Sequence, residues 1–79
     1  MRLLNDSTGE ALRSVIVYLT PDEARQLVGS LEQMLENPKD HHHHVNDDEY
    51  AHELTVTIYR DDNMGSFDER SRRLILDDE

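Results

Sequence analysis

The feature that most constrains this chain is a helix whose start and end are both signalled between Thr20 and Pro38. Thr20 is a good N-cap, because its hydroxyl accepts from the N–H groups left unpaired where a helix begins, and Glu23 three residues later completes a capping box. Pro21 falls at the first helical position, where its missing N–H costs nothing. Asn37 precedes a proline and therefore avoids helical geometry. We predict a helix from Pro21 to Asn37.

Apolar side chains recur along this helix at the spacing that builds one face. They are Ala24, Leu27, Val28, Leu31, Met34 and Leu35. A helix with one apolar stripe buries it against another element of the fold. We therefore expect Leu27, Leu31 and Leu35 to be buried in the core.

Several segments have the character of β-strands. Residues 12–19 are rich in β-branched and aromatic side chains and form a run too short to favour a helix. Residues 52–60 alternate apolar and polar side chains, as in a sheet with one buried and one solvated face. A last short strand is predicted at residues 72–77. Residues 1–11 fit either a short edge strand or a frayed terminus.

These elements predict an α+β fold in which residues 1–79 form one small domain. One amphipathic helix would pack on one face of a three- to four-stranded antiparallel sheet, with the approximate order β-β-α-β-β. Residues 39–50 would form a polar connection rich in histidine and acid. Because residues 12–19 have apolar side chains on both faces, we expect a second copy of the chain to cover Ile16 and Tyr18, giving a homodimer.

The charge of the chain bears on its partners. Eighteen acidic and eight basic residues give a formal net charge of −10, which argues against direct binding to nucleic acid or to an anionic membrane. A protein with a basic surface is the natural electrostatic complement. The candidate partner-binding residues are Asp47, Asp48, Glu49, Asp61 and Asp62. Two interpretations are open: each run is simply solvated, or in a hairpin-rich fold the runs meet at one edge and form a negative patch.

The run His41–His44 is the one segment with evident ligand chemistry, since imidazole is the commonest metal-binding side chain. In an extended segment alternate residues point the same way, so His42 and His44 can share one ion, and a hairpin would bring His52 near them. Zinc, nickel and copper would all fit. Contiguous histidines lack the spacing of a zinc motif, so the alternatives are a solvated loop, an edge strand whose imidazoles lie beside acidic residues, or a pH-responsive surface, and we expect no resident cofactor.

Catalytic signals are absent. The chain has no cysteine, no serine in a nucleophile elbow and no glycine-rich loop after a strand, so we expect no enzyme. Neither a signal peptide nor an apolar run of membrane-spanning length is recognisable, which predicts a cytoplasmic protein. The function indicated is a small acidic protein-interaction module, such as an inhibitor or accessory protein that binds a basic partner. The alternative is a metal-binding or metal- and pH-sensing module that uses His41–His44, and a small enzyme ranks third.

Overall fold

In the computed structural model, which describes all 79 residues, the chain has an α+β fold with two antiparallel sheets of two strands each. It divides into two compact units, Tyr18–Tyr59 and the combination of Met1–Val17 with Arg60–Glu79. The predicted α+β class is confirmed, whereas the predicted sheet of three to four strands is wrong. No helix has both the length and the apolar character that crossing a membrane requires.

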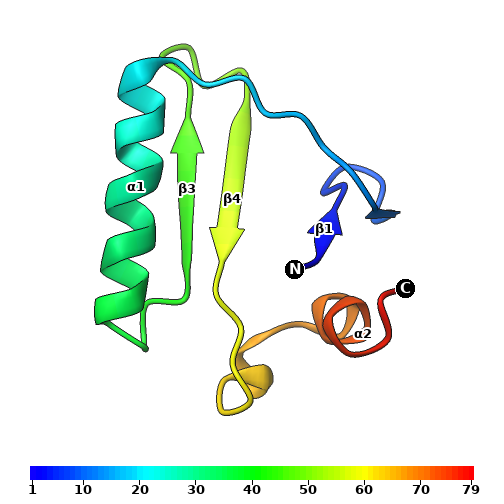
Figure 1. The fold of residues 1–79 in the computed structure, drawn as a ribbon. Coiled ribbons are helices and arrows are strands. Elements are labelled where there is room, and N and C mark those ends of the chain that lie inside the picture. The colour runs from blue at the N-terminus through cyan, green and yellow to red at the C-terminus, as the bar shows by residue number, and fades with distance from the viewer. The chain divides into compact units, whose positions relative to one another are not determined.

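The main helix of the Tyr18–Tyr59 unit, α1 (Pro21–Glu36), has the predicted bounds to within a residue (Figure 1). The predicted capping box is confirmed. Thr20 Oγ1 accepts from the Glu23 N–H at 3.2 Å, and Glu23 Oε1 accepts from the Thr20 N–H at 2.9 Å. Asn37 ends the helix in an extended conformation, with φ −120° and ψ 95°, as its position before Pro38 requires.

Two strands follow α1 and form an antiparallel hairpin, β3 (His42–Asn46) and β4 (Glu53–Thr57). The strand predicted at residues 52–60 is confirmed in its central part. Of the interpretations left open for the histidine run, the structure shows the extended one, since His42, His43 and His44 lie in β3. Alternation explains this: His43 and Val45 lie on the covered side of the hairpin, opposite Val56 and Leu54.

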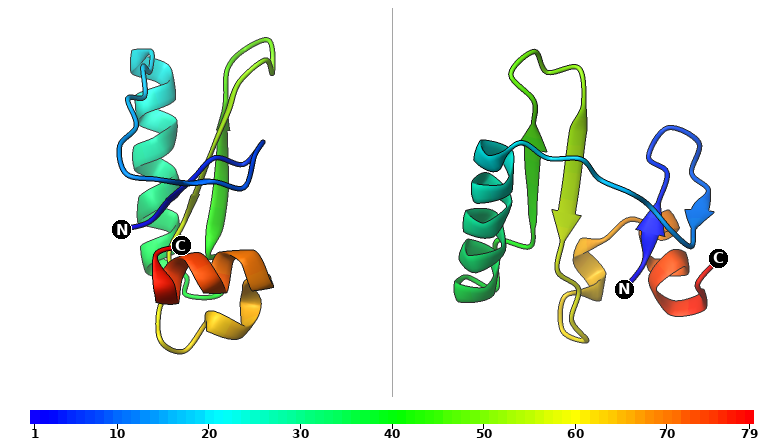
Figure 2. Two further views of the ribbon diagram at one scale, coloured as in Figure 1. Left: turned by 90° about the vertical axis from the view of Figure 1, so that its right-hand side faces the viewer. Right: turned by 45° about the horizontal axis from the view of Figure 1, so that its top comes forward.

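Helix α1 packs on β3, and the two strands lie side by side in both figures (Figures 1 and 2). The core of this unit is narrow: Met34 is 0% exposed and Val45 4%. Leu27 is half-buried, but Leu31 and Leu35 are 39% and 65% exposed, so the prediction that both are buried is wrong. A hairpin of two strands offers too little apolar surface to cover the whole stripe of the helix.

The other unit contains a short hairpin, β1 (Leu3–Leu4) paired with β2 (Ala11–Leu12), followed much later by the 3₁₀-helix η1 (Met64–Ser66) and by α2 (Glu69–Asp77). Of the two alternatives for residues 1–11, a short edge strand or a frayed terminus, the structure shows the short strand, β1. Two arginines join these elements. Arg70 donates to the Gly9 carbonyl from Nε at 3.0 Å and from Nη2 at 2.8 Å, and Arg2 Nε donates to the Leu74 carbonyl at 3.0 Å.

The strand predicted at residues 72–77 is wrong, because these residues lie in helix α2. Asp68 caps this helix, and its Oδ1 accepts from the Ser71 N–H at 2.7 Å. Leu74 is 5% exposed and forms the centre of this unit's small core. Three consecutive apolar residues fit either a strand or a helix. Here the N-cap at Asp68 favours the helix.

The strand predicted at residues 12–19 is present only at its first residue, since β2 ends at Leu12. Residues from Ser14 to Leu19 belong to no helix or strand and make no backbone hydrogen bonds. Ile16 is 74% exposed and Tyr18 88%. A high β-propensity describes how well a side chain fits a sheet, so it produces a strand only where a neighbouring strand is in place. Cover of these side chains by a second copy stays a prediction.

Candidate functional site

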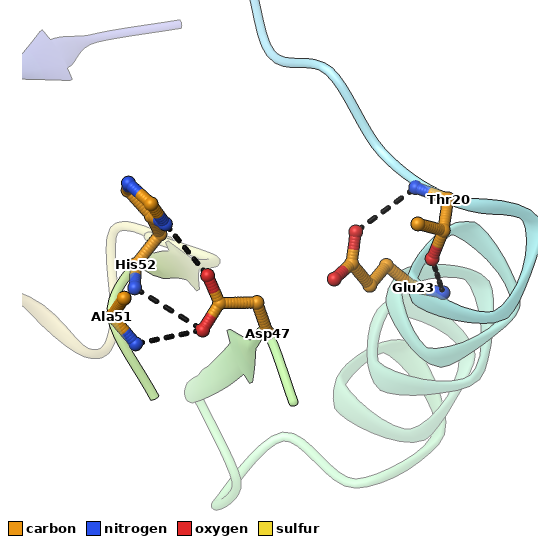
Figure 3. A network of polar contacts seen from close by, with 5 residues as sticks. All are labelled: Thr20, Glu23, Asp47, Ala51 and His52. Atoms are coloured by element: carbon orange, nitrogen blue, oxygen red, sulfur yellow. Dashed lines mark hydrogen bonds and ion pairs between the residues drawn. The ribbon is translucent and has the colours of Figure 1, made fainter. Parts of the chain in front are cut away.

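The connection between β3 and β4, Asp47–His52, is an ordered turn organised by its first residue (Figure 3). Asp47 Oδ1 accepts from the N–H groups of Ala51 and His52 at 2.7 and 3.3 Å. Its other oxygen, Oδ2, lies 2.6 Å from His52 Nδ1, which donates to it. In the backbone, the Tyr50 N–H donates to the Asp47 carbonyl at 3.0 Å. One carboxylate therefore fixes both the backbone of the turn and the imidazole that leads into β4.

The electrostatics of the turn follow from this geometry. The hydrogen bond from the His52 side chain holds the pKa of Asp47 below its ordinary value of 3.8, and the two backbone N–H groups act in the same direction. Asp47 consequently stays ionised at any pH near neutrality. Both oxygens of its carboxylate accept hydrogen bonds within the turn. Asp47 therefore stabilises this segment and is less available to a partner than an unbonded carboxylate would be.

The tip of the turn, defined here as Asp48, Glu49 and Tyr50, is exposed. Tyr50 is 81% exposed and adopts a φ of 54° in the left-handed region. That conformation costs a residue with a Cβ about 1–2 kcal/mol, and such strain concentrates where a segment has a role other than stability. The tip thus combines two carboxylates and one aromatic ring on a backbone that Asp47 holds in place.

Beside the turn lies a shallow hollow of about 240 Å³. Its lining is polar throughout: Gln26, His44, Asn46, Asp47, Asp48 and Tyr50. Most of these side chains can accept hydrogen bonds, and two carry negative charge. The surface around the tip is therefore suited to the donor groups of a lysine or arginine side chain.

The four histidines of the run are divided between the two faces of the hairpin. His43 lies on the side that α1 covers, where its Nε2 is 2.6 Å from Asp40 Oδ2. His44 is on the opposite, exposed face, and its Nδ1 lies 2.7 Å from Thr55 Oγ1 and 3.1 Å from Glu53 Oε1. These cross-strand contacts connect β3 with β4 and show why the run is compatible with a strand.

Of the predicted metal ligands, the structure brings His42 and His44 together, with ring centroids 5.6 Å apart in an edge-to-face arrangement. The third, His52, is engaged by Asp47 at the turn. No group of three histidine, aspartate or glutamate side chains is arranged to hold a metal ion. Glu53, which the sequence reasoning did not include, is the carboxylate next to His44.

The predicted acidic residues fall into two separate sets. Asp47, Asp48 and Glu49 lie in the turn before β4, whereas Asp61 and Asp62 lie after β4 and belong to the other unit. Because the two sets lie in different units, the single patch predicted for all five residues stays a prediction.

Sequence reasoning also missed Tyr50, and no signal in the sequence marks it, because a positive φ at a non-glycine residue follows from the surrounding turn. Comparisons of the chain with protein-family models, with curated proteins and with solved structures found no match. The residues of the chain and their contacts therefore carry the functional interpretation.

Proposed function

We propose that this protein is a small acidic interaction module that binds a basic surface of another protein through the tip of the β3–β4 turn. The observation that carries the proposal is the turn itself, whose exposed Asp48, Glu49 and Tyr50 are displayed on a backbone held by Asp47. A segment that is already ordered loses little conformational freedom when it binds, so more of its contact energy remains as affinity.

The chemistry of the tip suits a basic partner. Two carboxylates attract lysine and arginine, and the net charge of −10 adds long-range attraction that raises the rate of encounter. Tyrosine supplies a large contact area at low entropic cost and stacks with cations, which is why it is frequent in binding hot spots. The polar hollow beside Tyr50 would receive the end of a basic side chain.

Within this proposal the module acts by occupying a basic surface, as an inhibitor or an accessory protein does, and not by catalysis. The partner is a protein, not a nucleic acid or a membrane, and both act in the cytoplasm. The proposed binding surface leaves out Asp61 and Asp62, because they belong to the other unit.

The proposal is tested by affinity capture from a lysate of the native host with matched charge variants. The tip variant combines Asp48→Asn, Glu49→Gln and Tyr50→Ala, and the control combines Asp61→Asn with Asp62→Asn, which removes the same number of negative charges. We expect wild type and control to retain the same basic protein, released by raised salt, and the tip variant to lose it. Equal retention by the tip variant, or loss by the control alone, would show that the tip is not the binding surface.

A second candidate function is metal or pH sensing by the histidine run. The observation that favours it is the adjacency of the His42 and His44 rings on the exposed face, with Glu53 next to His44. These side chains are of the types that zinc and nickel accept, two imidazoles and one carboxylate, but no three such groups converge in the structure, so a site would require them to rearrange. Measuring Tm with and without zinc separates this role from the first one.

A further inference from the structure

The apolar face of helix α1 extends beyond the buried Met34 and the half-buried Leu27, and this outer part forms a seam of its own. It consists of Ala24, Val28, Leu31 and Leu35, a 4-3-4 spacing that we call the outer seam. Three of its members are substantially exposed: Val28 by 55%, Leu31 by 39% and Leu35 by 65%. Apolar residues with this spacing form a narrow straight seam of the kind through which two helices pack along their length.

We propose that the outer seam is the docking surface for a second copy of this chain, with the two α1 helices antiparallel about a two-fold axis. In that arrangement Val28 lies opposite Leu31 of the partner and Ala24 opposite Leu35 of the partner, so each small side chain faces a larger one. The surface is self-complementary, as a two-fold interface requires. The proposal stands apart from the binding role of the tip, which contributes no residue to the seam.

The charges that flank the seam favour a second copy in this orientation. Arg25 and Glu32 are both one residue beyond a seam position, on the flank that faces away from β3. In an antiparallel pair the two positions approach each other across the interface, so Arg25 faces Glu32 of the partner, and the symmetry produces this pair twice. Flanking pairs of opposite charge set the orientation of helix pairs in this way.

A parallel pair would not form these ion pairs. The flank with Arg25 and Glu32 would then lie beside the partner's opposite flank, which carries Leu27 and Met34, so neither charge would meet an opposite charge. The helix dipoles would also be aligned instead of opposed. Arg25 already has one local carboxylate, Asp22, at 2.5 Å, but both side chains are largely exposed and the guanidinium keeps donors for a second partner.

Two copies that each carry a net charge of −10 repel one another, so the association is weak at low ionic strength. Salt screens this repulsion over distances beyond about 10 Å at 0.1 M and affects the close Arg25–Glu32 contact less. The dimer therefore becomes tighter as salt is raised, which is the reverse of the salt dependence expected for the tip and its basic partner.

Sedimentation equilibrium on the full chain tests the surface. We expect the wild type to dimerise and expect Val28→Lys or Leu35→Lys to raise the dimer dissociation constant at least about tenfold. The matched control is Gln33→Lys, which makes the same charge change on the opposite, exposed side of α1 and should leave dimerisation unchanged. Circular dichroism confirms that each variant is folded. A wild type that stays monomeric up to about 1 mM, or an equal effect of the control, overturns the proposal.

Orientation is tested by charge exchange and by cross-linking. Arg25→Glu and Glu32→Arg should each weaken the dimer, and the double variant should restore it, because the exchange recreates both pairs. The chain has no cysteine, so single cysteines report cleanly. An oxidised mixture of Ala24→Cys and Leu35→Cys chains should yield mainly the mixed disulfide. Cross-linking of each variant mainly with itself would indicate a parallel pair and would refute the antiparallel arrangement.

Discussion

Replacing Met34 by alanine should destabilise this protein far more than replacing its neighbour Leu35. Met34 is 0% exposed between α1 and the hairpin, whereas Leu35 is 65% exposed. Truncating a fully buried methionine costs about 2–5 kcal/mol, from lost transfer energy and the cavity left behind. A chain of 79 residues has a total stability of about 4–12 kcal/mol. The substitution therefore removes a large fraction of the stability and should lower Tm by roughly 10–40 °C.

Leu35→Ala is the matched control, because it removes an apolar side chain from the adjacent position of the same helix. At a protein concentration low enough for sedimentation to show a monomer, we expect it to change stability by about 0.5 kcal/mol at most. Thermal and urea unfolding followed by far-ultraviolet circular dichroism measure both variants. Equal losses of stability for Met34→Ala and Leu35→Ala would refute the reasoning, because they would mean that Met34 and Leu35 are buried to the same extent.

Three further predictions concern the cap, the turn and the histidines. Thr20→Ala should cost about 1 kcal/mol in urea unfolding because it removes the N-cap of α1, whereas Thr20→Ser should be nearly neutral; equal costs would exclude capping as the cause. His52→Ala should raise the pKa of Asp47 towards 3.8 in a carboxyl-carbon NMR titration. Because that pKa is lowered in the folded state, Asp47 stabilises the fold above pH 3.8 and loses this contribution as the pH falls through the lower value, and an unchanged titration would remove His52 as the cause. Zinc in excess should leave Tm unchanged in both the wild type and the His42→Ala/His44→Ala variant, since no three ligands converge; a rise in the wild type alone would favour metal sensing.

The parts of the fold that were predictable from the sequence are those whose determinants are local. The bounds of α1 follow from Thr20, Glu23 and Pro38, which act on neighbouring backbone groups. In β4, apolar and polar side chains alternate, and this alternation by itself identifies the covered and the exposed face of the strand. Helix α2 was missed because three consecutive apolar residues, Leu74–Leu76, indicate no period, and the cap that decides the matter lies six residues upstream at Asp68.

The features of the candidate site that the sequence did not predict depend on contacts between residues far apart in the sequence. Histidine has no strong preference for strands, so β3 became recognisable only through its pairing with β4 and through Val45 against α1. The predicted acidic patch stays a prediction, because Asp61 and Asp62 belong to a different unit from Asp47, Asp48 and Glu49. Of the candidate site, Asp48 and Glu49 were predicted for their charge, but the role of Asp47 as the organiser of the turn and the display of Tyr50 depend on backbone geometry that composition does not encode.

The exposed segment from Ser14 to Leu19 has a consequence for how this protein behaves in concentrated solution. It is a run of six uncharged residues, most of them β-branched or aromatic, without proline and without backbone partners, which is the composition of a cross-β nucleus. Mutual repulsion between chains of net charge −10 keeps such segments apart at neutral pH. Near the isoelectric point of about 4.7 that repulsion vanishes while the segment stays exposed. Mild acidification should therefore convert a clear solution into fibrils that bind thioflavin T, and Ile16→Lys should prevent it.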